Sequence, residues 1–151
     1  MKKRIIALGL LWCLSAVMLQ AARVDTVLVR SAAMNKDVKV VYVLPDKAIG
    51  KQACPVVYLL HGYDGNARSW VQLKPELPQM ADEKGIIFVC PDGKNSWYWD
   101  SPENPAYRYE TFVTSELVKY TDGNYATIPD RKARAISGLS MGGHGALWSA
   151  I

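Results

Sequence analysis

The chain has 151 residues, the length of one ordinary domain, and its 50% hydrophobic and 21% charged residues fit a globular protein with a hydrophobic core. Three of its 18 basic residues lie within the first four positions. A mature chain starting at position 23 would therefore have 15 basic and 14 acidic residues, a net charge of +1. A net charge that small gives no indication of a nucleic-acid partner or of binding to an anionic membrane.

Residues 1–22 are typical of a secretory signal peptide, with basic residues first, an apolar run over 5–19 and small residues at the end. We therefore expect a mature domain over 23–151 that is exported to the periplasm or the extracellular space. A retained membrane anchor is the alternative, but the apolar run is short for a span of about 20 residues. Lipid attachment at Cys13 is disfavoured by the bulky Trp12 before it.

Beyond residue 22, segments with strand periodicity alternate with segments of helical character. Strands are expected at 24–30, 36–44, 55–60, 86–90 and 133–137, the last three as buried strands. Helices are expected at about 77–83, 110–120 and 143–151. This alternation predicts a single α/β domain with a mostly parallel sheet and flanking helices.

Two cysteines remain after removal of the signal segment, and we expect both to be free. Cys54 precedes one predicted strand, whereas Cys90 ends another. If those strands are parallel, the two sulfurs lie at opposite ends of the sheet, on the order of 15 Å apart at about 3.3 Å per residue. A disulfide needs Cα atoms within about 7 Å of each other.

The segment Gly138-Leu139-Ser140-Met141-Gly142 has the pattern of a nucleophile elbow, a sharp turn between a buried strand and a helix. Such a turn exposes a serine hydroxyl at the carboxyl edge of a sheet. Gly138 and Gly142 are needed because a Cβ atom at either position would collide with the neighbouring strand or helix. The alternative is a glycine-rich turn whose serine has no chemical role.

A second loop, in the segment Leu59-Leu60-His61-Gly62-Tyr63-Asp64-Gly65, leaves the first long apolar strand. A serine that attacks an ester builds negative charge on the carbonyl oxygen, and preorganised backbone N–H groups stabilise that charge. We expect one donor at Met141, directly after the serine, and the other at Tyr63, with Gly62 letting the loop approach the substrate. The alternative is an ordinary turn at the end of a strand.

The two histidines, His61 and His144, are both expected to be structural. His61 stands in the predicted oxyanion loop, and His144 stands on the first turn of the helix after Ser140, where its ring would point into the packing behind the turn. Neither has metal-ligand neighbours, so no metal site is expected. Trp97 and Trp99 follow the strand at 86–90 and could contact substrate, but covering the sheet as core residues is an equally good interpretation.

With both loops identified, the chain resembles the esterase D-like branch of the α/β-hydrolase fold. That branch includes feruloyl and acetylxylan esterases, S-formylglutathione hydrolase and the mycolyltransferases. The resemblance is carried by residues 55–62, 89–93, 95–98, 110–112 and 136–147. It implies that Ser140 is the nucleophile and that the amides of Tyr63 and Met141 form the oxyanion hole.

In this family the catalytic acid and histidine follow the nucleophile, and only eleven residues of this chain come after Ser140. The resemblance therefore implies the N-terminal part of an esterase domain, incomplete at its C-terminus, with the Asp or Glu and the His of the triad supplied by a missing C-terminal half.

The predicted function is that of a secreted serine carboxylesterase. It would cleave a carbohydrate- or phenolic-acid-linked ester through an acyl-enzyme on Ser140, with no cofactor and no stable membrane insertion. One alternative is an acyltransferase of the same family. The other is a non-catalytic exported remnant or binding protein, which applies if 151 residues are the natural product.

Overall fold

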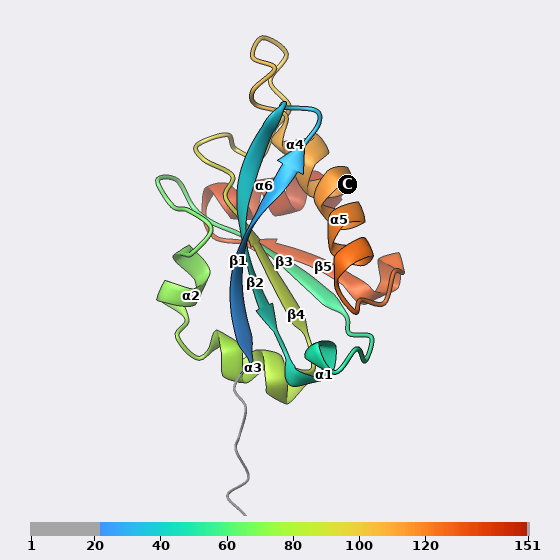
Figure 1. Ribbon diagram of the computed structural model, residues 1–151. Helices are drawn as coiled ribbons and strands as arrows, with labels where there is room; N and C mark the ends of the chain where they lie inside the picture. The colour runs from blue at the N-terminus through green and yellow to red at the C-terminus, as the bar shows by residue number, and fades with distance from the viewer. Residues whose placement is uncertain (1–21, 151) are drawn as a thin grey trace, which may run out of the picture.

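A five-stranded sheet forms the centre of the computed structural model, which describes residues 22–150, so nearly all of the predicted signal segment lies outside the described residues. The strands are β1 (Arg23–Ser31), β2 (Lys36–Leu44), β3 (Val56–Leu60), β4 (Ile87–Pro91) and β5 (Arg134–Gly138). Their order is β1-β2-β4-β3-β5 (Figure 1). Strands β3, β4 and β5 are mutually parallel, and β2 is antiparallel to both β1 and β4. The sheet is therefore mixed, with β2 as the reversed strand; the predicted parallel arrangement holds for β3, β4 and β5.

Helices and shorter helical turns flank both faces of the sheet (Figure 1). They are α1 (Asp46–Ile49), α2 (Ser69–Leu73), α3 (Leu77–Lys84), α4 (Tyr109–Thr111), a π-helical turn (Phe112–Glu116), α5 (Leu117–Asn124), a 3₁₀ turn (Arg131–Ala133) and α6 (Met141–Ala150). The helix predicted at 77–83 is confirmed, and it ends where Gly85 adopts a left-handed φ of 63°.

The hydrophobic core is divided by the sheet into two clusters. Phe112, Val113 and Leu117 belong to the cluster that also contains residues of α6, whereas Leu77 and Ala81 of α3 belong to the cluster on the other face. Strands β3 and β4 lie between the two clusters. Their nearly continuous apolar sequences follow from this position, because both faces of each strand are covered.

Strand β5 differs from the prediction of a buried strand, because its residues alternate between half-buried and exposed. The physical reason is its position at the end of the sheet order, where β3 is its one neighbour within the described part of the chain. At its start, the guanidinium of Arg134 pairs with the carboxylate of Asp122 from α5. The outer edge of β5 therefore leaves backbone groups without a strand partner.

Three further differences concern local structure. Helices α1 and α2 are short segments that the periodicity did not indicate, and the helix predicted at 110–120 is interrupted by the π-helical turn. Helix α6 begins at Met141, two residues earlier than expected. Cys54 and Cys90 are both free, as predicted, and both are buried. Within residues 22–150, no helix has the length and apolar character needed to cross a membrane.

Candidate active site

Ser140 lies on a sharp turn between β5 and α6, at the carboxyl edge of the sheet. Its backbone is left-handed, with φ of 53°, a conformation that costs a non-glycine residue roughly 1–2 kcal/mol. The turn is closed by the Gly142 N–H, which donates to the Leu139 carbonyl at 2.8 Å. The His144 N–H donates to the Ser140 carbonyl at 3.0 Å and continues the helix. This strained turn leaves the Ser140 residue exposed to solvent.

The glycines on either side of Ser140 allow two backbones to approach closely, as predicted. A Cβ atom on Gly138 would lie 2.8 Å from the Cα of Gly142 and closer still to its carbonyl. A Cβ atom on Gly142 would lie 2.7 Å from the His61 carbonyl oxygen and closer still to that of Leu60. Both sets of neighbours are backbone atoms, which cannot rotate away. Glycine is therefore required at both positions for α6 to begin directly over the end of β3.

The loop after β3 lies against this turn. The Leu139 N–H donates to the Leu60 carbonyl at 3.2 Å, which holds the end of β3 against the turn. A Cβ atom added to Gly62 would lie 3.6 Å from the Cβ of Ser140, so the Gly62 backbone directly faces the serine. Tyr63, the next residue, has a largely exposed side chain, whereas the Met141 side chain is fully buried. The structure thus brings the Gly62-Tyr63 backbone and the first turn of α6 to Ser140.

Met141 is the first residue of α6. Its N–H is one of the first N–H groups of the helix, and these groups have no partner within the helix. This end of a helix also carries a partial positive charge. An oxygen that becomes negative beside Ser140 would therefore lie close to a donor that is already oriented.

His61 is buried at 1% exposure, and both of its ring nitrogens are engaged. Nδ1 lies 2.7 Å from the Gly62 carbonyl oxygen and Nε2 accepts the Gly93 N–H at 2.9 Å, so the neutral ring carries its proton on Nδ1. The ring joins the loops that follow β3 and β4. This arrangement agrees with the predicted structural role, and it leaves no ring nitrogen to take a proton from Ser140.

Tyr98 connects the same two loops to α6, a role that no sequence pattern indicated. Its hydroxyl accepts the His61 N–H at 2.9 Å and donates to the His61 carbonyl at 3.3 Å, and the whole residue is buried. Its ring fills the space against Gly93 and Gly145, where an added Cβ atom would approach it to 2.8 Å or less. Trp97 and Tyr98 are both left-handed, with φ of 56° and 59°. Two consecutive strained residues therefore direct Tyr98 inward and Trp97 outward.

Asp92 lies beside His61 at the end of β4 and was not predicted as part of the site. Its carboxylate accepts both the Lys94 N–H at 3.0 Å and the Lys94 ammonium at 2.9 Å, and it lies 3.6 Å from Nε2 of His61. Burial opposes ionisation of this carboxyl, but the hydrogen bonds from the Lys94 ammonium and N–H are stronger and hold its pKa well below the usual range. Asp92 therefore supports the loop as an anion.

Trp97 and Trp99 form an exposed aromatic surface together with His144 and Trp148. The His144 ring lies 5.5 Å from that of Trp97 and 5.6 Å from that of Trp99, and the Trp99 and Trp148 rings lie 5.8 Å apart. The Trp148 indole N–H donates to Glu110 at 2.9 Å. Trp97 and Trp99 are 46% and 48% exposed. Of the three aromatic residues 97–99, the outer two remain available for contact, and Tyr98 alone belongs to the core.

The position of His144 corrects one expectation. Its ring was predicted to point into the packing behind the turn, but it contacts Trp97 and Trp99 of the aromatic surface. The direction of the first turn of α6 determines this position. Its Nδ1 is buried without a hydrogen-bond partner in the described part of the chain.

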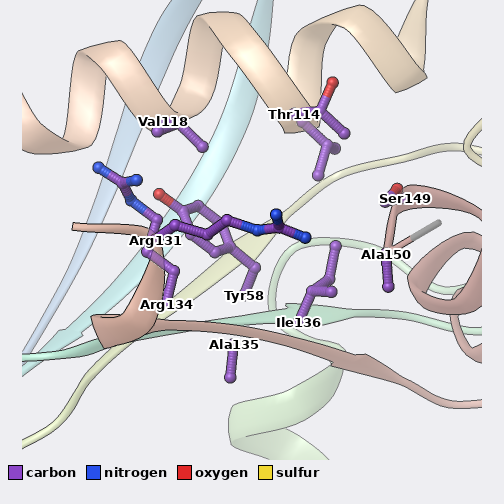
Figure 2. Close-up of a pocket in the computed structure, with 10 residues that line it drawn as sticks. Tyr58, Thr114, Val118, Arg131, Arg134, Ala135, Ile136, Ser149 and Ala150 are labelled. Atoms are coloured by element: carbon purple, nitrogen blue, oxygen red, sulfur yellow. The ribbon is translucent and has the colours of Figure 1, made fainter. Parts of the chain in front are cut away.

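A separate pocket of about 480 Å³ lies between α5, β5 and the end of α6, and Figure 2 shows Thr114 and Val118 on one side of it and Ile136 on the other. Its walls include the start of β5 and the last residues of α6, at the end opposite to the turn. Ser140 does not contribute to it. Among residues 22–150, no group of acidic, histidine and cysteine side chains could hold a metal ion.

Comparisons with known proteins show the family of the chain. The family model described as "Putative esterase" matches residues 31–151. The chain belongs to this esterase family. It is 30% identical over 125 residues to an acetyl esterase from Caldicellulosiruptor saccharolyticus, covering 78% of this chain and 46% of the relative. It is 32% identical over 132 residues to the S-formylglutathione hydrolase of Bos taurus, covering 74% of this chain and 45% of the relative.

Solved structures show the same fold. An S-formylglutathione hydrolase from Agrobacterium tumefaciens superposes with a TM-score of 0.75 at 28% identity, over 86% of this chain and 53% of the other. A ferulic acid esterase superposes with a TM-score of 0.72 at 30% identity, over 84% of this chain and 54% of the other. The α/β-hydrolase fold of the family is therefore present, and the chain spans about half the length of the relatives that it matches.

Proposed function

We propose that Ser140 is the nucleophile of a serine carboxylesterase. The observation that carries this proposal is the turn itself: an exposed serine in a left-handed conformation, at the start of a helix and against the Gly62 backbone. Strained residues of this kind cost free energy and cluster at functional sites. Membership of the esterase family and relatives named acetyl esterase and ferulic acid esterase support the same reaction class.

In the proposed reaction, the Ser140 oxygen attacks the carbonyl carbon of the ester, and the carbonyl oxygen becomes an oxyanion. The Met141 and Tyr63 amides donate to that oxyanion, and each such donor is worth about 3–4 kcal/mol. The tetrahedral intermediate expels the alcohol and leaves an acyl group on Ser140. Water then attacks the acyl-enzyme and releases the acid.

The attacking serine must lose a proton, and the chain has two histidines. His61 uses both ring nitrogens within the loops, and His144 packs between the indoles of the aromatic surface. We therefore place the proton acceptor, and the acid that orients it, outside residues 22–150. The segment 1–22 supports an exported location for the protein.

An ester of a carbohydrate or of a phenolic acid is the proposed substrate, since the half-exposed Trp97 and Trp99 offer flat apolar faces beside the turn. Acyl transfer is the second candidate. It is favoured by 32% identity over 134 residues to the diacylglycerol acyltransferase/mycolyltransferase Ag85A of Mycobacterium gordonae. In that reaction an acceptor hydroxyl would replace water at the acyl-enzyme.

The test expresses the complete reading frame that contains these 151 residues and measures p-nitrophenol release from p-nitrophenyl acetate. We expect acetylation of the peptide that contains Ser140, and a loss of turnover of at least about 10³-fold in Ser140→Ala. Unchanged turnover in Ser140→Ala would refute the nucleophile assignment. Adding a sugar alcohol separates the two candidates, because transfer yields the acetylated sugar, whereas hydrolysis yields acetate alone.

A further inference from the structure

The residue before β1 is tied to the last turn of α3. The Ala22 N–H donates to the Oδ2 atom of Asp82 at 2.7 Å, although the two residues lie 60 positions apart in the chain. Ala22 is 7% exposed and belongs to the core cluster that contains Leu77 and Ala81 of the same helix. Figure 1 shows the beginning of β1 beside α3. Both a hydrogen bond and burial therefore hold Ala22 in place.

The Asp82 carboxylate has two backbone donors but no cation partner in the described part of the chain. Oδ2 accepts the Ala22 N–H, and Oδ1 accepts the Asp46 N–H at 2.8 Å. None of the ion pairs among residues 22–150 includes Asp82. Asp82 also lies in the last turn of α3, where the partial negative charge of the helix end disfavours an anion and favours a cation. A positive charge on the Ala22 nitrogen would be favourable for both reasons.

Removal of the signal segment can place that charge on Ala22. Small residues at the end of a signal segment mark the cleavage site, and this chain offers Ala21 and Ala22. A cut after Ala22 would leave Arg23 first and would remove the donor to Asp82. A cut after Ala21 would keep Ala22 and convert its uncharged amide nitrogen into an α-ammonium. The distance of 2.7 Å to Asp82 lies in the range of a charged N–H···O pair.

We propose that the chain is cut between Ala21 and Ala22, and that the new α-ammonium of Ala22 pairs with the Asp82 carboxylate. Water, added by a signal peptidase of the exporting cell, attacks the Ala21 carbonyl carbon, and the C–N bond breaks. The carboxyl proton passes to the freed amine, which leaves a carboxylate on Ala21 and an ammonium on Ala22. The inference rests on the exported location proposed above and is independent of the assignment of Ser140.

The proposed pair anchors the first strand of the sheet. In the described part of the chain, β2 is the one strand neighbour of β1, and Arg23 opposite Leu44 ends their ladder. Ala22 directly precedes that end, where a ladder separates most easily. A charged hydrogen bond is roughly twice as strong as a neutral one. The cut therefore strengthens a contact that the uncut chain makes only with an amide.

Intact-mass spectrometry tests the position of the cut. The complete reading frame is expressed with its own signal segment and purified from the exported fraction. We expect a chain that lacks residues 1–21 and begins at Ala22. A mass smaller by one alanine residue, which means a start at Arg23, would overturn the proposal, and so would a start at any other residue. A chain of full mass would overturn the exported location as well. The turnover assay of Ser140→Ala tests the nucleophile separately from all of these outcomes.

Acetylation of the α-amine tests the ion pair. Limiting acetic anhydride is added at about pH 8, close to the ordinary pKa of an α-amino group. Only the uncharged amine reacts, and a neighbouring carboxylate favours the charged form. We therefore expect Ala22 of the wild type to react about fivefold more slowly than Ala22 of Asp82→Asn. Peptide mass spectrometry measures the two rates, each normalised to the lysines of the same sample.

Glu83→Gln is the matched control for Asp82→Asn. It removes a carboxylate from the next position of α3, where Glu83 accepts a hydrogen bond from Gln79 at 2.6 Å. It should change the rate at Ala22 by less than about twofold, because the proposed partner is Asp82 and not the general charge of the helix. Equal rates in the wild type and Asp82→Asn would overturn the ion pair, and so would an equal acceleration in Glu83→Gln.

Discussion

Gly142 lies so close to the backbone at the end of β3 that the substitution Gly142→Ala should destabilise the protein. The new Cβ atom would lie 2.7 Å from the His61 carbonyl oxygen and closer still to that of Leu60, whereas ordinary contacts lie at 3.4–4 Å. Both neighbours are backbone groups of the loop after β3, so α6 must move away from that loop. Overpacking of this kind costs about 1–3 kcal/mol, and sometimes more.

A gain in helix propensity of up to about 1 kcal/mol opposes this cost. Because the new Cβ atom meets backbone atoms that cannot rotate away, we place the cost at the upper end of that range and expect a net loss of about 2 kcal/mol in the free energy of unfolding. With an m-value of about 1–3 kcal/mol/M in urea, the midpoint of unfolding should fall by roughly 1 M. Urea denaturation followed by circular dichroism measures this shift. In the proposed reaction, the same movement carries the Met141 amide away from Gly62, so ester turnover should fall as well.

Gly123→Ala is the matched control, because it makes the same chemical change in a helix where the new Cβ atom meets nothing within 4 Å. It should stabilise the protein by about 0.5–1 kcal/mol through helix propensity. The two substitutions are therefore expected to have opposite signs. An unchanged midpoint for Gly142→Ala, or an equal fall for Gly123→Ala, would refute the argument from close approach.

Three further predictions concern Tyr98, Asp92 and Ser140. Tyr98→Phe leaves the buried His61 N–H and carbonyl without a partner, so it should lower the free energy of unfolding by about 1–3 kcal/mol in a urea titration. Tyr63→Phe is the control, because the Tyr63 ring is exposed; it should change the free energy of unfolding by less than about 0.5 kcal/mol. Because the pKa of Asp92 is lowered in the folded state, its stabilising contribution is present above the unfolded pKa of about 3.9 and is lost as the pH falls further. The urea midpoints of wild type and Asp92→Asn should therefore converge at low pH. A difference between the two midpoints that stays constant down to acidic pH would contradict this direction of the pKa shift. Ser140→Gly should be more stable than Ser140→Ala by about 0.5–1 kcal/mol in thermal or urea unfolding, because glycine adopts the left-handed conformation without strain; the reverse order would show that the turn is not strained.

The sequence was most informative where local chemistry and backbone geometry coincide. The close approaches at Gly138 and Gly142 could be predicted because the motif requires small residues on both sides of a strained serine. Buried strands β3 and β4 could be predicted because burial on both faces imposes a continuous apolar run.

Contacts between distant segments could not be predicted in the same way. The left-handed pair Trp97-Tyr98 contains no glycine or asparagine, so its conformation has no local signal. The exposure of β5 depends on which strands lie beside it, which its own apolar sequence does not reveal. The Arg134–Asp122 pair likewise joins elements that only the tertiary structure brings together.

The position of Tyr98 has a consequence for how the proposed oxyanion donors move. Its hydroxyl is bonded to the backbone of His61, two residues before Tyr63, and its ring lies against Gly145, four residues after Met141. The two segments that carry the donors therefore rest on opposite parts of one rigid aromatic side chain. We infer that the thermal displacements of the two segments are correlated. The distance between the Tyr63 and Met141 amide nitrogens therefore varies less than the position of either amide.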